Sequence, residues 1–186
     1  MIKIIFLLLV AGNAMAIEQP SYSVILENGK FEIRSYPRHI VAETIVRGEF
    51  DNVGNRAFRR LGGYIFGSND ADKKISMTAP VTQQATDDGY FVRFYMPVEH
   101  DLSDLPEPLD NTVTVRESAG GTFAVISYKG GWKQKLYLEQ KSVLLEELEQ
   151  HPDWIVSGEP IWARYNSPMM PAFLRLNEIL IPIVPR

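Results

Sequence analysis

The sequence predicts an α+β fold, an antiparallel sheet or barrel with two helices packed on it, and three observations support this prediction. Several short segments alternate apolar and polar residues, as strands with one buried face do. Two longer segments carry apolar residues at helical spacing. The order strand, strand, helix, strand, strand occurs twice along the 186 residues, and this order is typical of helices packed on an antiparallel sheet.

Composition narrows the class of protein. The chain is 45% hydrophobic and 23% charged, with a formal charge of −4 and no cysteine. These values are typical of one globular domain and exclude collagen-like, coiled-coil and wholly disordered chains. The acidic balance predicts no nucleic-acid partner. The missing cysteines exclude thiol catalysis and disulfide bonds.

Residues 1–16 are predicted to be a signal peptide. Lys3 supplies a positive start, residues 4–12 are apolar but too short to span a membrane, and Ala14-Met15-Ala16 places small residues at the cleavage site. We therefore expect a mature domain of residues 17–186 that is periplasmic or secreted, has no membrane span and is a monomer.

The first half of the domain extends from about residue 20 to 98. A helix is expected from Asp51 or Asn52 to about Phe66, where Gly67 ends it. The other elements expected here are strands at Phe31–Tyr36, Ile40–Val46 and Tyr90–Met96, an extended segment at Met77–Gln83 and a hairpin turn at Asp88-Gly89.

The second half extends from about residue 111 to 186, after an acidic linker at residues 98–111. A helix is expected over Lys133–Gln150, ended by Pro152. Its apolar stripe comprises Leu136, Tyr137, Val143, Leu144 and Leu148. The strands expected in this half are Thr112–Arg116, Thr122–Tyr128, Ile155–Ala163 and Glu178–Val184.

The two halves also resemble each other in sequence. Three pairs of identical residues are 82 positions apart: Arg34 and Arg116, Ala42 and Ala124, Gly48 and Gly130. Later, Phe94–Val98 resembles Ile179–Ile183 at an offset of 85. These matches predict a duplicated fold with a pseudo-twofold axis.

Most motifs of known chemistry are absent from the chain. It contains no nucleophile elbow, no phosphate-binding glycine loop and no helical zinc motif. His39, His100 and His151 lie far apart and show no ligand spacing, so we expect neither a metal site nor a fixed haem ligand among them.

Two segments are less easily explained by packing alone. Gly54, Phe58 and Gly62 follow one another at four-residue spacing, which places an aromatic ring between stretches of bare helical backbone. The loop over residues 165–171 is rich in proline yet contains Met169 and Met170, whose flexible side chains adapt to varied apolar surfaces. Each segment is equally consistent with core packing or with a binding surface for a flat apolar molecule.

Longer motifs identify a family resemblance. Tyr64–Asn69 followed by Lys74–Thr82 closely resembles the signature of the SOUL haem-binding family, and the closing Ala163-Arg164-Tyr165-Asn166 matches it as well. The similarity covers essentially the whole mature chain. It implies a distorted antiparallel β-barrel of two repeated halves (β-β-α-β-β each) flanked by two α-helices, with haem or another tetrapyrrole as ligand and no catalytic cofactor.

The resemblance also implies a site, an apolar groove between the first helix and the loop near the C-terminus. Some relatives carry lysine where Gly63 and Met170 stand, so Arg56, Arg59 or Arg164 would have to meet the ligand's acidic groups here. The matching positions are Asn55, Phe58, Arg59, Gly62, Gly63, Tyr165, Met169 and Met170.

Three functions are consistent with this sequence. The first is an exported, non-enzymatic carrier, buffer or scavenger of tetrapyrroles. The alternatives are an enzyme acting on haem or a related macrocycle, and a general module for apolar small molecules. The carrier leads because no residue set shows the pattern of acid–base or nucleophilic catalysis.

Overall fold

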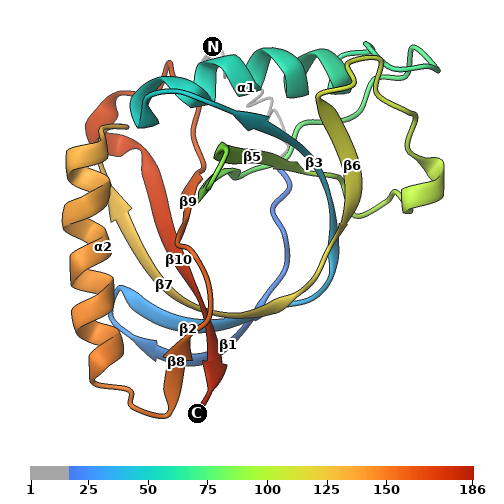
Figure 1. Ribbon diagram of the computed structural model, residues 1–186. Helices are drawn as coiled ribbons and strands as arrows, with labels where there is room; N and C mark the ends of the chain where they lie inside the picture. The colour runs from blue at the N-terminus through green and yellow to red at the C-terminus, as the bar shows by residue number, and fades with distance from the viewer. Residues whose placement is uncertain (1–16) are drawn as a thin grey trace, which may run out of the picture.

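The computed structural model describes residues 17–186, and the predicted signal peptide at residues 1–16 lies outside the described residues. Ten strands form one antiparallel sheet that carries two long helices on its outer face (Figure 1). The strands are β1 (Ser23–Asn28), β2 (Phe31–Tyr36), β3 (His39–Val46), β4 (Val81–Thr86), β5 (Gly89–Tyr95), β6 (Val113–Ser118), β7 (Gly121–Lys129), β8 (Trp154–Val156), β9 (Ile161–Arg164) and β10 (Leu176–Pro185). The helices are α1 (Phe50–Ile65) and α2 (Gln134–Glu149), with short 3-10 turns η1 (Leu102–Asp104) and η2 (Ala172–Leu174).

The α+β prediction is confirmed, but the sheet is not a closed barrel. Its strands follow the order β1-β2-β7-β10-β9-β4-β5-β3-β6, with β8 also paired to β10. Closure requires every strand to be paired on both edges. Within residues 17–186, β1 and β6 end the path without pairing to each other, so the sheet is strongly curved and open.

The duplication is visible in the strand order and in the register. The equivalent strands of the two halves are β2 and β6, β3 and β7, β4 and β9, and β5 and β10. When each strand is replaced by its equivalent, the strand order from β2 to β6 is obtained in reverse. Arg34 lies opposite Phe123 and Arg116 lies opposite Val41, so both pairs obey the offset of 82. The first two strands of each half are therefore equivalent, as the sequence predicts.

The offset of 85 expected for the last strands is wrong by two residues. Val41 lies opposite Tyr95, and its equivalent Phe123 lies opposite Pro182, which makes the true offset 87. Side chains alternate between the faces of a strand, so a slip of two residues keeps every side chain on its own face. The hydrophobic pattern therefore could not distinguish the two alignments.

Two further elements differ from expectation. Strand β1 was not predicted, because it is an edge strand with mostly exposed residues and lacks a clear buried face. The single strand expected over Ile155–Ala163 is divided into β8 and β9. Gly158 and Pro160 lie in the gap, and both residue types interrupt strands.

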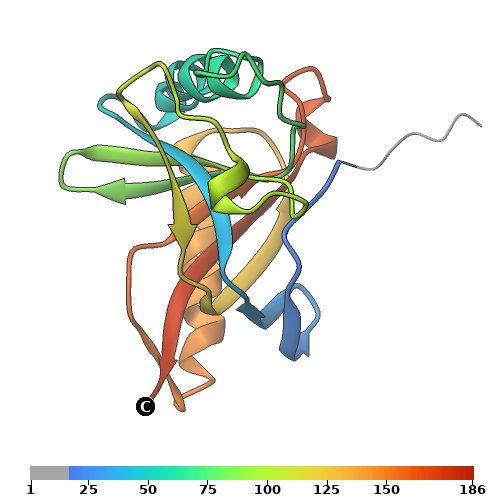
Figure 2. The same ribbon diagram turned by 90° about the vertical axis from the view of Figure 1, so that its right-hand side faces the viewer.

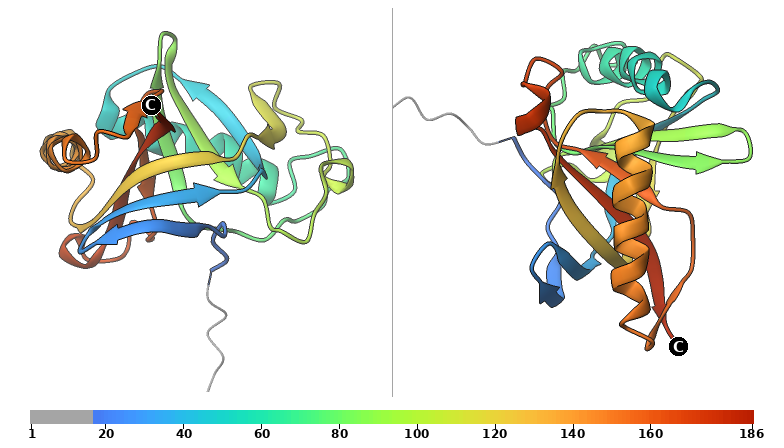
Figure 3. Two further views of the ribbon diagram at one scale, coloured as in Figure 1. Left: turned by 90° about the horizontal axis from the view of Figure 1, so that it is seen from below. Right: turned by 90° about the vertical axis from the view of Figure 1, so that its left-hand side faces the viewer.

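Each helix packs on the outer face of its own half of the sheet. The α1 residues Val53, Ala57 and Leu61 are fully buried against β3 and β5. Helix α2 lies across β7 and β10 (Figure 3) and buries Tyr137, Leu144 and Leu148, whereas the predicted stripe residue Val143 is exposed. No helix of the described chain is both long and apolar enough to cross a membrane.

The concave face of the sheet is unusually polar. Arg34 is buried and pairs with Glu178 at 3.0 Å and with Glu32 at 2.8 Å. Glu43 is likewise buried and accepts bonds from Arg93 at 2.8 Å and Arg116 at 2.7 Å. Arg34 and Arg116 are equivalent positions of the two halves, and each contacts a buried carboxylate. For Arg34 this is Glu178 on β10, and for Arg116 it is Glu43 on β3.

Candidate functional site

The flank of α1 next to its buried stripe carries an exposed apolar strip. Phe58 is 39% exposed, and its ring lies 5.5 Å from the buried Phe94 ring. A methyl group on Gly62 would lie 3.4 Å from the Phe58 ring and 3.6 Å from the ring of Phe66, which is 56% exposed. The two phenyl rings therefore meet over Gly62, which is itself buried, and the rings form the exposed part of the strip.

Phe66 is a site residue that the sequence analysis did not name. It continues the four-residue spacing of Gly54, Phe58 and Gly62 by one step, so the signal was present in the sequence. The helix ends at Ile65, and Gly67 with φ of 117° turns the chain away after Phe66. This turn leaves the Phe66 ring at the end of the strip.

The loop after β9 presents a second apolar surface at the same end of the molecule as α1 (Figure 2). Met169 is 93% exposed and Phe173 is 73% exposed. Arg175 fixes the loop by donating to the carbonyl oxygens of Met170 at 2.8 Å and Pro168 at 2.7 Å. The apolar side chains thus project from a loop whose backbone is hydrogen-bonded to Arg175.

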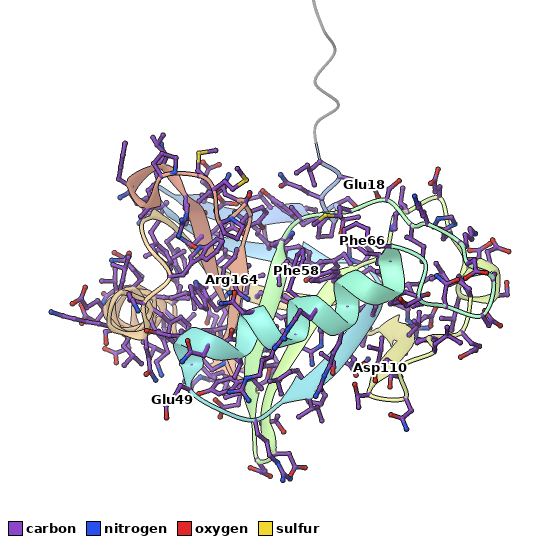
Figure 4. All side chains as sticks on the ribbon, turned by 90° about the horizontal axis from the view of Figure 1, so that it is seen from above. Glu18, Glu49, Phe58, Phe66, Asp110 and Arg164 are labelled. Atoms are coloured by element: carbon purple, nitrogen blue, oxygen red, sulfur yellow. The ribbon has the colours of Figure 1, made fainter. Side chains whose placement is uncertain are left out.

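The structure distinguishes among the three arginines considered for an acidic group of the ligand. Arg56 lies against Gly48 and lines a cavity of about 720 Å³ on the opposite flank of α1, together with Arg60. Arg164 lies on the flank of Phe58, with its guanidinium against Gly54 (Figure 4). Arg59 is exposed and follows Phe58 around the helix toward the solvent-facing side.

The remaining predicted site residues are dispersed. Asn55 is exposed on α1, and the backbone of Gly63 lies near Ser68, away from the strip. Tyr165 points into the concave face, where its hydroxyl donates to Glu178 at 2.5 Å. Burial and this carboxylate both raise the pKa of Tyr165. The structure therefore places Phe58 and Gly62 on one strip of α1, leaves Met169 and Met170 on the loop at the same end of the molecule, and turns the Tyr165 hydroxyl into the concave face.

The histidines lie away from the apolar strip. His39 and His100 line a separate cavity of about 380 Å³ beside the N-terminal segment. Burial lowers the pKa of His39, although its Nδ1 lies 3.0 Å from the Pro37 carbonyl oxygen. His151 stacks on Phe31, with ring centroids 5.1 Å apart. Across residues 17–186, no cluster of three or more His, Cys, Asp or Glu side chains could hold a metal ion.

The rings of Phe58 and Phe66 offer an apolar surface that one face of a planar macrocycle such as haem could contact. Met169 and Met170 have flexible side chains that adapt to apolar surfaces. Haem would bring iron and two acidic groups to this surface, and Arg164 is the cation on the same flank.

Comparison with known proteins identifies the family of this chain. The sequence profile described as "SOUL heme-binding protein" matches residues 17–182. The chain is 30% identical to human "Heme-binding protein 2" over 180 residues, covering 89% of this chain and 86% of the human protein. It is 27% identical to "Heme-binding protein 1" of Xenopus tropicalis, covering 80% and 81% of the two chains.

Solved structures show the same fold at much lower identity. The crystal structure of a hydrolase from Listeria innocua superposes with a TM-score of 0.64 at 9% identity, covering 86% of this chain and 94% of that one. At this identity the likeness concerns the fold alone. The profile match and the human relative, by contrast, extend over nearly all of the described residues. The chain therefore belongs to the SOUL haem-binding protein family.

Proposed function

We propose that this protein is an exported carrier that binds haem or another tetrapyrrole on the apolar strip of α1. The observation that carries the proposal is the presence of two exposed apolar surfaces at the same end of the molecule, Phe58 and Phe66 on the helix flank and Met169 and Phe173 on the loop after β9. Isolated exposed apolar residues are ordinary, but a contiguous group indicates an interaction surface.

The ligand is held by apolar contact. Burial of apolar area contributes about 25 cal/mol per Å², so removing roughly 200 Å² from water contributes about 5 kcal/mol. Association entropy offsets part of this gain. Through this contact alone a macrocycle can therefore bind with a Kd of about 0.2 mM or weaker, without an iron ligand from the protein. Iron-free porphyrin should bind as haemin does.

Export is part of the proposal and rests on the signal-peptide pattern of residues 1–16. Mass spectrometry of exported protein should find an N-terminus at Ile17, and an intact Met1 in that material would contradict export by cleavage.

The binding test is a titration of the mature protein with haemin and with iron-free protoporphyrin, followed by Soret absorbance. Phe58→Asp should weaken both ligands by about tenfold or more, because a carboxylate replaces part of the apolar wall. Leu138→Asp is the matched control, since it places the same charge on an equally exposed apolar position of α2.

Replacing each histidine by alanine distinguishes face binding from iron ligation. His39→Ala, His100→Ala and His151→Ala should leave the haemin affinity within about twofold, because none of these side chains lies on the strip. Loss of haemin binding in one of these variants, with porphyrin not bound at all, would establish an axial-ligand site and contradict the proposal.

A further inference from the structure

The buried polar side-chain atoms that lack a hydrogen-bond partner are concentrated in one region of the described structure. Four carry hydrogens that could be donated and two can only accept. The donors are Arg164 Nε, Trp132 Nε1, Trp162 Nε1 and the Tyr128 hydroxyl, and the acceptors are Gln83 Oε1 and Asn177 Oδ1. Buried polar atoms are normally satisfied, so six unsatisfied atoms in one region require an explanation.

Strand pairing makes these residues neighbours. Arg164 lies opposite Asn177 of β10, and Asn177 lies opposite Tyr128 of β7. Trp162 lies opposite Gln83 of β4. All are on the outer face of the sheet, where the first turn of α1 approaches the start of α2.

Arg164 is the centre of this cluster. Its guanidinium carbon lies 4.9 Å from the Trp162 ring centroid and 5.5 Å from that of Trp132. Burial lowers the pKa of Arg164 to about 10, so the side chain remains a cation at neutral pH. Burial raises the pKa of Tyr128, and the neighbouring Trp162 indole opposes this shift, although no well-formed hydrogen bond joins the two groups.

Two other arginines differ from Arg164, which is half-buried as a residue but has a buried Nε. Arg34 and Arg93 each have a carboxylate within 3.0 Å. Arg164 has no carboxylate within ion-pair distance anywhere in residues 17–186. Buried charges are paired in stable proteins because an isolated one is costly. The missing counter-charge must therefore come from outside the chain or be replaced by water.

The position of Arg164 links it to the apolar strip. A methyl group on Gly54 would lie 2.5 Å from its Nη1, so the bare backbone of Gly54 makes room for the guanidinium. Phe58 follows Gly54 by one helical turn, about 6 Å along the axis. Figure 4 shows Arg164, Phe58 and Phe66 in succession along the same side of α1.

We propose that Arg164, Trp132, Trp162 and Tyr128, here named the Arg164 site, bind a carboxylate of a ligand whose apolar body lies on the Phe58 strip. That the apolar body of the ligand lies on this strip depends on the function proposed above. A guanidinium with additional N–H and O–H donors matches the two oxygens of a carboxylate, and such charge-assisted bonds are strong and directional. The site thus selects acidic amphiphilic ligands over neutral ones of the same shape.

The first test compares protoporphyrin, a diacid, with its dimethyl ester, which has the same ring without the charges. The wild-type protein should bind the diacid about tenfold or more tightly than the ester. Arg164→Gln should reduce this ratio to about twofold while leaving the ester affinity unchanged. Arg56→Gln, which removes the same charge from the opposite flank of α1, should keep the wild-type ratio.

Gly54→Ala provides a second variant that retains Arg164 but displaces its guanidinium by the added methyl group. It should also reduce the ratio, whereas Arg164→Lys should keep part of it, since it retains a cation. A wild-type protein without preference for the diacid, or an Arg164→Gln variant that keeps the full preference, would overturn the proposal.

The second test examines the site without a tetrapyrrole. Butyrate at millimolar concentration should change tryptophan emission in the wild-type protein, because Trp132 and Trp162 form part of the site. Chloride at equal ionic strength should not, and Arg164→Gln should abolish the response. If porphyrins do not bind but the butyrate response is present, the strip proposal fails and the Arg164 site stands. A butyrate response no larger than that of chloride would show that water alone fills the cluster, and would overturn the site.

Discussion

At the residue scale, Arg164 carries a positive charge at a position where that charge lowers the stability of the fold. The lowering of the Arg164 pKa to about 10 corresponds to a cost of about 3 kcal/mol for holding the charge in its surroundings. Contacts with the faces of Trp132 and Trp162 return about 1–2 kcal/mol. A residue whose charge costs more free energy of folding than its contacts contribute is typical of a functional site.

Replacing this arginine should therefore not destabilise the fold. Arg164→Met keeps most of the side-chain volume and removes the charge, so the melting temperature should stay the same or rise by about 2–4 °C. Thermal unfolding followed by circular dichroism measures the change. A fall of more than about 5 °C would identify Arg164 as a structural residue.

At the element scale, the two helices are joined at their N-termini by one side chain. Asp51 in the first turn of α1 accepts a bond from the Gln134 N–H at 2.9 Å and pairs with Lys133 at 3.0 Å. Burial alone would raise the pKa of Asp51, but the Gln134 N–H and Lys133 together hold it below its usual value. Asp51 thus acts as the N-terminal cap of α2 from a distant part of the chain.

Asp51→Ala should lower the stability by about 1 kcal/mol, or about 2–4 °C in melting temperature, because the α2 terminus loses its acceptor. Asp51→Asn is the matched control, since it keeps the acceptor and loses only an exposed ion pair worth about 0.5 kcal/mol. A depressed pKa in the folded state adds stability above the ordinary pKa of aspartate. The difference in stability between wild type and Asp51→Ala should therefore shrink as pH falls below about 4. If Asp51→Ala and Asp51→Asn lower the stability equally, Asp51 does not act as a cap.

At the scale of the whole molecule, the open sheet curves so that charged groups lie on its concave face, and the two helices cover its apolar outer face. Glu43 on β3 accepts bonds from Arg93 on β5 and Arg116 on β6, which joins three neighbouring strands on the concave face. Burial tends to raise the pKa of Glu43, but the two guanidinium groups outweigh it and hold the pKa below its usual range. Inward-facing charges of this kind also oppose slippage of the strands.

Glu43→Gln should destabilise the protein by about 2–3 kcal/mol, because it leaves the nearly buried Arg93 without its counter-charge. This corresponds to a melting temperature about 5–10 °C lower at neutral pH. The stability that Glu43 supplies is present above the ordinary glutamate pKa and is lost as pH falls through its depressed folded-state pKa, so the two proteins should converge in acid.

The control for Glu43→Gln is Glu117→Gln, which breaks an exposed pair with Arg38 at 3.7 Å. Exposed pairs contribute little, so this variant should melt within about 2 °C of wild type. If Glu43→Gln and Glu117→Gln have the same melting temperature, the ion pairs of the concave face contribute no more to stability than surface charges do.

Local patterns in the sequence were sufficient to predict both helices, most of the strands and most of the residues that face the core, with Val143 an exception. Alternation with period two and spacing near 3.6 are properties of single elements, so Phe31–Tyr36 and the α1 stripe could be assigned without knowing their partners. The SOUL signature and the strip of Phe58 and Gly62 could be identified from sequence for the same reason, since each lies within one short segment.

Only the tertiary structure decided how these elements meet. It left the sheet open, aligned the last strands at an offset of 87, turned the Tyr165 hydroxyl into the concave face and placed the guanidinium of Arg164 against Gly54. These outcomes depend on strand order and register between segments far apart in the chain, which a periodic pattern does not specify. The physical reason is that alternation determines which face a side chain occupies, whereas its neighbour across the sheet depends on which strands have paired.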